Sequence, residues 1–118
     1  ILSLRSSDVK FNAGNGSTRM DKEYPFPIEY MDGWVHLTLV VDREAGEIRF
    51  AYDFGDFITT EIPAALKKSS FDAYKNLCIG QDGTKKYSSA LPAVLDEFVL
   101  IDGVLSADDL AALSEFYK

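Results

Sequence analysis

Short stretches in which every second residue is apolar recur along the chain, a pattern that predicts β-strands joined by turns. Residues 1–5 and 9–13 fit two short strands, and residues 18–23 fit a third that returns beside them. The segment 14–18 is rich in glycine and asparagine, which accept positive φ, so we expect a turn there. Residues 24–32 contain two prolines and are predicted to form a connecting loop.

The strongest strand pattern covers residues 34–42, directly after Gly33. Its two faces are both largely apolar: Val35, Leu37, Leu39 and Val41 on one, and Trp34, His36, Thr38 and Val40 on the other. A strand of this kind is predicted to be central in a sheet and covered on both sides. Residues 42–46 then form a hairpin loop with a glycine, and residues 47–54 return as the partner strand with one apolar face.

Weaker patterns continue the β character toward the C-terminus. Residues 57–62 fit a strand ended by a proline, and residues 64–68 fit one helical turn. Residues 75–80 and 94–101 fit two further strands, the second with apolar residues on both faces.

The chain closes with a pattern typical of a short helix. Ser106 is a good N-cap, and Asp109 stands three residues later as its capping-box partner. Leu105 and Leu110 have the spacing of a hydrophobic staple. Many strands followed by one helix predict a single all-β domain over residues 1–118, a mostly antiparallel β-sandwich.

Composition limits the functions that such a domain can have. The 118 residues are 47% hydrophobic, which is enough for a packed core and excludes global disorder. The net charge of −7 argues against binding nucleic acid or anionic membranes, because phosphates would repel it. One cysteine and one histidine exclude a disulfide framework and a zinc site rich in either residue. No apolar run reaches the roughly 18 residues of a membrane span.

Four polar side chains cluster around the first predicted turn: Asn12, Asn15, Arg19 and Asp21. Asparagine and aspartate commonly stabilise turns, and the arginine and aspartate can pair with each other. Alternatively, these groups line a glycan site, since sugars bind planar amides and carboxylates beside an aromatic ring. Tyr24 and Tyr30 are the candidates for that ring.

Three further carboxylates stand in loops that combine acidic residues with an aromatic one: Asp53, Asp56 and Asp82. Such loops occur in sugar-binding sites and also in ordinary solvated hairpins, so both interpretations stay open. His36 has no second histidine or cysteine in an obvious motif and is expected to be a core histidine. Cys78 is expected to be a small buried hydrophobe in a strand.

Asp96 is the polar residue that stands out in the last predicted strand, because it shares a face with Val94 and Phe98. A buried carboxylate must be hydrogen-bonded, paired or bound to a metal. Its neighbour Glu97 points to the opposite face, so the two cannot act on one substrate as the paired acids of a glycosidase do. No nucleophile elbow, phosphate loop or zinc motif is present, and we expect no enzyme activity.

Residues 33–42, 77–80 and 95–106 together resemble the concanavalin A-like superfamily, and within it the laminin G-like jelly-roll domains of bacterial surface proteins and glycoside hydrolases. The resemblance covers residues 33–118 and implies an antiparallel jelly-roll β-sandwich with a short C-terminal helix. Full members have more strands before the position where this chain begins, so we expect a fragment lacking its N-terminal strands. In the family, the aspartate matching Asp96 often helps to hold a structural calcium ion.

The resemblance implies a non-catalytic accessory module of a bacterial extracellular or cell-surface protein, with carbohydrate as the expected ligand. One alternative is a structural or protein-interaction spacer that binds no sugar, and a third is a degenerate glycoside hydrolase domain. The expected protein partner is the missing N-terminal strands, a neighbouring domain or another copy of the chain, because an incomplete jelly roll exposes sheet edges.

Overall fold

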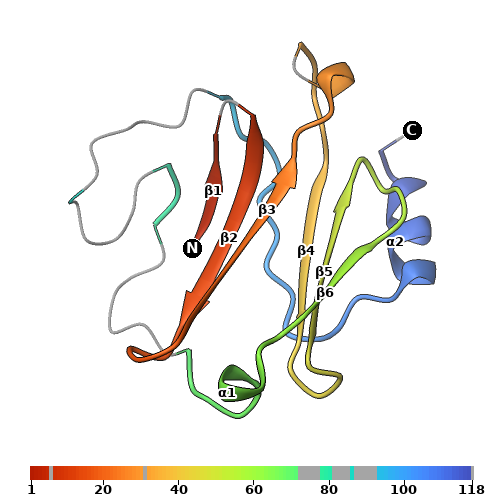
Figure 1. Ribbon diagram of the computed structural model, residues 1–118. Coiled ribbons are helices and arrows are strands. Elements are labelled where there is room, and N and C mark those ends of the chain that lie inside the picture. The colour runs from red at the N-terminus through yellow and green to blue at the C-terminus, as the bar shows by residue number, and fades with distance from the viewer. Residues whose placement is uncertain (6, 31, 72–77, 81–85, 87–92, 118) are drawn as a thin grey trace. The chain divides into compact units, whose positions relative to one another are not determined.

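The computed structural model describes residues 1–5, 7–30, 32–71, 78–80, 86 and 93–117. Contacts divide the chain into two compact units, the first formed by Ile1–Phe26 with Ser69–Leu100 and the second by Pro27–Lys68 with Ile101–Lys118. Each unit holds one three-stranded antiparallel sheet (Figure 1). The described residues thus confirm a mostly β protein with a short helix near its C-terminus.

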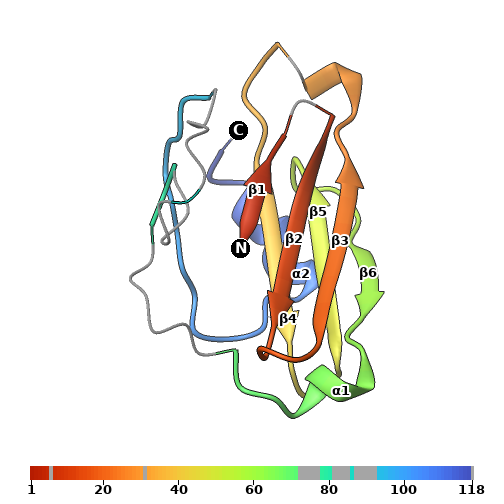
Figure 2. The same cartoon turned by 60° about the vertical axis from the view of Figure 1, so that its left-hand side comes forward.

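The sheet of the first unit is built from β1 (Leu2–Leu4), β2 (Asp8–Gly14) and β3 (Arg19–Pro25), side by side in that order (Figure 2). All three strands match those predicted from the N-terminal pattern. The alternation places one row of apolar side chains on the buried face: Val9, Phe11, Met20 and Tyr24. The polar residues between them form the opposite face.

The predicted turn joins β2 to β3, and a side chain holds its shape. The Asn15 amide oxygen accepts hydrogen bonds from the backbone N–H groups of Ser17 and Thr18, at 3.1 and 2.8 Å. Gly16 has φ +93°, which favours glycine. Gly14 is required for a different reason, since a Cβ there would lie 2.9 Å from the Thr18 carbonyl oxygen.

The second unit contains three strands and three short helices: η1 (Ile28–Tyr30), β4 (Leu37–Asp42), β5 (Glu47–Tyr52), β6 (Ile58–Glu61), α1 (Ala64–Lys67) and α2 (Ala107–Ser114). The strand order is β4-β5-β6. The core of this sheet lies on β5, where Ile48, Phe50 and Ala51 are fully buried. The predicted hairpin and its partner strand are therefore confirmed.

The position of β4 differs from the prediction in two ways. The strand begins at Leu37, and Trp34 before it is 71% exposed. Within the described residues β4 is also an edge strand, and β5 occupies the centre. The alternating pattern reports that both faces of a strand are apolar, but it carries no information about how many neighbouring strands pair with it.

The hairpin between β4 and β5 is fastened to α1. The Arg43 guanidinium donates to the carbonyl oxygens of Leu66 at 3.2 Å and of Lys67 at 3.0 Å, at the C-terminal end of this short helix, where carbonyl groups lack helical partners. Gly46 has φ +74°, and a Cβ at this position would lie 2.9 Å from the Lys67 Cε. The loop therefore needs glycine for its backbone conformation and for its packing.

The C-terminal helix α2 begins as its sequence predicts. The Ser106 hydroxyl accepts from the Asp109 backbone N–H at 3.1 Å, and the Asp109 carboxylate accepts from the Ser106 N–H at 2.9 Å. The hydrogen bonds from Ser106 lower the pKa of Asp109 below its usual value. Leu110, on the next turn, is buried. In the described parts of the chain, no helix is long and apolar enough to cross a membrane.

The strand predicted at residues 94–101 is absent, and this prediction is wrong for the structure. The segment is irregular, and its side chains, including Asp96, are exposed. Cys78 is likewise exposed and lies outside any strand, which corrects the expected burial of its thiol. Residues 75–77 of the strand predicted there lie outside the described residues.

Candidate functional site

The outer face of the first sheet carries six charged side chains of balanced sign: Arg5, Lys10, Arg19, Asp8, Asp21 and Glu23. Asp21 accepts from both Arg19 at 2.6 Å and Lys10 at 3.0 Å. The hydrogen bond from Arg19, followed by that from Lys10, lowers the pKa of the Asp21 carboxyl. The predicted pairing of Arg19 with Asp21 is confirmed, and it engages both side chains in the sheet's own charge network.

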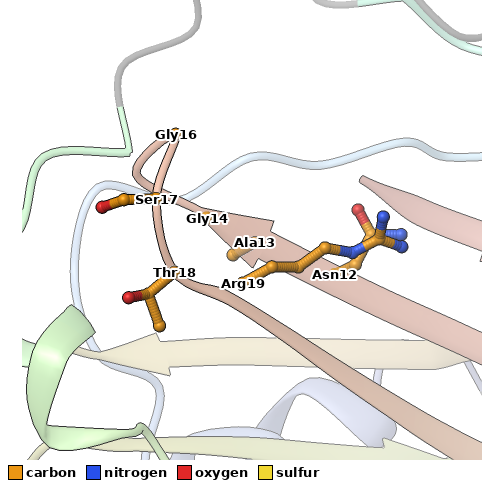
Figure 3. A pocket seen from close by; sticks show the side chains of 7 residues that line it. All are labelled: Asn12, Ala13, Gly14, Gly16, Ser17, Thr18 and Arg19. Atoms are coloured by element: carbon orange, nitrogen blue, oxygen red, sulfur yellow. The ribbon is translucent and has the colours of Figure 1, made fainter.

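An open pocket of about 310 Å³ lies beside the turn between β2 and β3 (Figure 3). It is lined by Asn12, Ala13, Gly14, Gly16, Ser17, Thr18 and Arg19. In Figure 3 the hydroxyls of Ser17 and Thr18 point to the opposite side from the Arg19 guanidinium, so the polar groups do not converge on one point. A ligand site needs polar groups aimed at a common position, and this pocket lacks that arrangement.

The structure does bring the four residues predicted around this turn together. Asn15 uses its amide oxygen within the turn and donates from Nδ2 to the Ser69 hydroxyl at 2.8 Å. Asn12 stands opposite Asp21 in the sheet register, and its carboxamide makes no hydrogen bond within the described structure. Three of the four therefore have structural partners, which favours the turn-stabilising interpretation.

A second group of candidate residues lies in the second unit, where three rings stack at one end of β4. The His36 and Phe54 rings are stacked at 3.9 Å, and the Phe54 and Tyr117 rings at 5.4 Å. The His36 and Tyr117 rings are 5.8 Å apart. We call His36, Phe54 and Tyr117 the aromatic cluster. It joins the start of β4, the loop after β5 and the residues that follow α2.

The loop that supplies Phe54 has an unusual backbone. Asp53 and Phe54 have φ angles of +47° and +61°. Aspartate tolerates the left-handed region, whereas a bulky residue there costs roughly 1–2 kcal/mol. The Asp53 N–H donates to the His36 carbonyl oxygen at 2.7 Å, and the Gly55 N–H donates to the Tyr52 carbonyl oxygen at 2.8 Å. Backbone strain held by such contacts is most often found at functional sites.

His36 is half-buried at the rim of the sheet, which corrects the expectation of a core histidine. Its Nδ1 lies 3.2 Å from the Thr38 hydroxyl oxygen. Burial lowers the pKa of His36 below 6.5, and the nearby Asp53 carboxylate opposes this shift. The burial that lowers this pKa comes in part from the stacked Phe54 ring.

Trp34 extends this end of the sheet into solvent. It lies two residues before His36, ahead of the first residue of β4, and 71% of its surface is exposed. Within the described structure its indole has no ring contact, hydrogen bond or ion pair. The carboxylates of Asp53 and Asp56 are exposed on the neighbouring loop. We call Trp34, the aromatic cluster and these two carboxylates the aromatic–acidic site.

The aromatic residues first proposed for a glycan site have other roles. Tyr24 is 1% exposed and belongs to the core of the first unit. Tyr30 packs against Tyr52, with ring centroids 5.8 Å apart. The sequence named the acidic and aromatic loop at residues 53–57 as a candidate and left its role open. Sequence reasoning did not connect that loop to residues 34–36 or to Tyr117, because the pattern along one strand does not reveal which distant rings stack.

Asp82 and Asp96 are the remaining candidate ligands predicted from the sequence. Asp82 lies outside the described residues. Asp96 is exposed and not the buried carboxylate that its strand pattern predicts. Calcium takes about six to eight oxygen ligands, and in the described residues no three histidine, cysteine, aspartate or glutamate side chains come together.

No family model, curated protein or solved structure matches the chain. The choice of function therefore depends on the residues of the aromatic–acidic site and on the sequence resemblance described above.

Proposed function

We propose that the chain is a non-catalytic module that binds carbohydrate at the aromatic–acidic site. The observation that carries this proposal is Trp34, a large ring that is 71% exposed and lies two residues before His36, whose carbonyl oxygen holds the loop with the exposed Asp53 and Asp56. Tryptophan is enriched at interfaces, because its ring offers a large apolar surface and its N–H can donate a hydrogen bond. In the proposal, the module is a concanavalin A-like, laminin G-like jelly roll that accompanies other domains in a bacterial extracellular or surface protein.

The chemistry of a sugar suits these groups. One face of a pyranose ring presents C–H groups, which pack on the negative face of an indole. Its hydroxyls donate to carboxylates such as Asp53 and Asp56, and hydrogen bonds to charged acceptors are stronger than neutral ones. A sugar would therefore stack on Trp34 and donate to the loop.

The arrangement is also preorganised, which reduces the entropic cost of binding. The stack of His36 on Phe54 and the hydrogen bond from Asp53 to the His36 carbonyl fix the loop before any ligand arrives. Tyr117 packs on the Phe54 ring, with ring centroids 5.4 Å apart. The non-catalytic part of the proposal comes from the sequence, which lacks the Glu-x-Asp-x-x-Glu pattern of hydrolases in this superfamily.

A spacer or protein-interaction module is the second candidate, and different observations favour it. The charges on the outer face of the first sheet pair with one another, and Asn15 serves its own turn. Residues 94–101 expose several large apolar side chains that suit a protein partner better than a sugar.

A binding experiment with matched variants separates the two candidates. The chain is titrated by calorimetry with a panel of neutral soluble glycans, and the titration is repeated with Trp34→Ala and with Asp53→Asn plus Asp56→Asn. We expect each variant to lose about tenfold or more in affinity, since central aromatic anchors dominate such sites. Ile28→Ala is the control, because Ile28 is 82% exposed in the same unit but outside the site. Wild-type chain that binds no glycan, or equal affinities for all variants, would contradict the proposal.

A further inference from the structure

The net charge of the chain lies entirely in the second unit. That unit has twelve acidic and five basic residues, whereas the first unit has seven of each, so the second unit alone accounts for the net charge of −7. A surface with an excess of one sign attracts ions of the opposite charge and repels ions of its own. The charge of a ligand should therefore affect how strongly it binds to the second unit.

The excess of negative charge is also present at the aromatic–acidic site itself. Residues 32–36, 53–56 and 115–117 meet there, because rings from all three segments stack and a backbone hydrogen bond joins the first two. These segments contain four acidic residues, all exposed, and no basic residue: Asp32, Asp53, Asp56 and Glu115. Lys118 comes next in the chain and lies outside the described residues. Acidic residues remain in excess when it is counted.

Three of the described basic residues of the second unit lie at the other end of its sheet. Arg43 is in the hairpin loop between β4 and β5, and it donates to carbonyl oxygens of α1. Lys67 and Lys68 belong to the C-terminal end of α1. In the register of the hairpin this loop and His36 stand at opposite ends of β4, six residues or about 20 Å apart. At physiological ionic strength charges are largely screened beyond about 8 Å, so these cations do not neutralise the site.

Arg49, on β5, is the remaining described cation of this unit, and carboxylates already hold its charge. Its guanidinium lies 3.5 Å from the carboxylate of Asp42 and 3.6 Å from that of Glu47, both at the hairpin end of the sheet. The same group lies 5.4 Å from the centre of the Phe57 ring, which follows the acidic loop. The positive charge that approaches this loop is therefore shared between two other carboxylates.

We propose that the aromatic–acidic site selects glycans by charge, binding a cationic amino sugar more tightly than a neutral sugar and a neutral sugar more tightly than an acidic one. This inference rests on the proposed carbohydrate binding and names the class of glycan. Among the described residues, no cation forms an ion pair with Asp53 or Asp56, so both carboxylates can accept from an ammonium group. An ammonium group donates charge-assisted hydrogen bonds and is attracted to the face of an indole such as Trp34. A uronate or sulfate group would be repelled by the same carboxylates.

Matched glycans that differ in charge test the selection. The chain is titrated by calorimetry, at a mildly acidic pH that keeps sugar amines protonated, with oligosaccharides of glucose, glucosamine and glucuronic acid and with the same three of the galactose series. In at least one series we expect the amino sugar to bind about fivefold more tightly than the neutral sugar, the gain that one or two exposed ion pairs give. The acidic sugar is expected to bind more weakly than the neutral one. Added salt should reduce the preference for the amino sugar, because it screens exposed charges.

Two variants show whether the selection arises at this site. Asp53→Asn plus Asp56→Asn removes both loop charges and keeps the rings, and it is expected to bring the ratio of amino-sugar to neutral-sugar affinity close to one. Glu44→Gln is the matched control, because Glu44 is an exposed acid of the same unit in the hairpin loop at the opposite end of β4. At physiological ionic strength its ratio is expected to equal that of the wild type.

The failure of this inference and the failure of the proposed function give different results. Three results would overturn selection by charge while carbohydrate binding stands: equal affinities for the three glycans of each series, tightest binding of the acidic glycan, or an affinity ratio that the double aspartate variant leaves unchanged. A wild-type chain that binds none of the six glycans would instead contradict the proposed function, and charge selection with it.

Discussion

At the scale of single residues, the neighbourhood of His36 links charge, stacking and backbone shape. Its ring packs on Phe54 at 3.9 Å, and its carbonyl accepts from the N–H of Asp53. Burial lowers the pKa of His36, while the Asp53 carboxylate raises it. A change at Asp53 should therefore be detectable at His36 without disturbing the fold.

The first prediction concerns this coupling. Asp53→Asn removes the negative charge but keeps a residue type that tolerates φ +47°. The pKa of His36 is expected to fall further below 6.5 in this variant, because only the opposing influence is removed. The measurement is an NMR titration of the single histidine in both proteins. An unchanged or raised pKa would show that the carboxylate does not act on the ring.

The second prediction concerns stability against pH. A histidine whose folded-state pKa lies below 6.5 binds its proton more readily in the unfolded chain. The free energy of unfolding should therefore decrease as the pH falls through 6.5 toward the folded-state pKa. His36→Gln removes this contribution, so urea unfolding of wild type and variant should converge or cross as the pH falls from about 7 to about 5. A constant difference across that range would contradict the assigned direction.

At the scale of elements, hydrogen bonds attach the hairpin between β4 and β5 to the helix α1. Arg43 bonds two carbonyl oxygens at the end of α1, and Lys67 pairs with Glu61 of β6 at 2.8 Å. Ile62 donates its N–H to the Gly46 carbonyl oxygen at 2.8 Å, so the segment after β6 is attached to the same loop. The hairpin loop is thus a point where a small change should affect the whole sheet.

The third prediction tests the packing of the β4–β5 hairpin loop against α1. Gly46→Ala places a Cβ at φ +74° and 2.9 Å from the Lys67 Cε, and is expected to lower the free energy of unfolding by about 1–2 kcal/mol. Gly33→Ala is the matched control, since nothing lies within 4 Å of a Cβ there. Denaturant unfolding of both variants checks the prediction. Equal stabilities for the two variants would show that the loop does not depend on glycine.

The secondary-structure elements also show how much of this fold could be predicted from the sequence. The turn at Asn15, the hairpin glycine and the capping box of Ser106 with Asp109 were predictable, because each depends on residues close together in the chain. The edge position of β4 and the exposure of Asp96 were not, because they depend on which distant segments pair.

The candidate site divides in the same way. The sequence named Asp53 and Asp56 as candidates, since the acidic and aromatic residues of their loop follow one another in the chain. It gave His36 a core role and left Trp34 and Tyr117 out of the site, because ring stacking joins residues from three separate parts of the chain. The resemblance to laminin G-like domains suggested carbohydrate, but it did not indicate this end of the sheet.

At the scale of the whole molecule, two exposed apolar features stand out on a chain with a net charge of −7. The aromatic–acidic site combines one exposed ring with carboxylates, which suits a small polar ligand such as a sugar. Residues 94–101 expose several large apolar side chains, which suits another polypeptide.

The fourth prediction is the most direct test of carbohydrate binding at this site. The chain has one tryptophan, so fluorescence excited at the red edge of its absorption, where the six tyrosines do not absorb, reports on Trp34 alone. Titration with the glycan panel is expected to give a saturable change in emission for at least one sugar, together with protection from quenching by acrylamide. Strong acrylamide quenching in the free chain is the control that shows the ring to be accessible. Quenching that no glycan reduces, with emission that no glycan alters, would contradict the account.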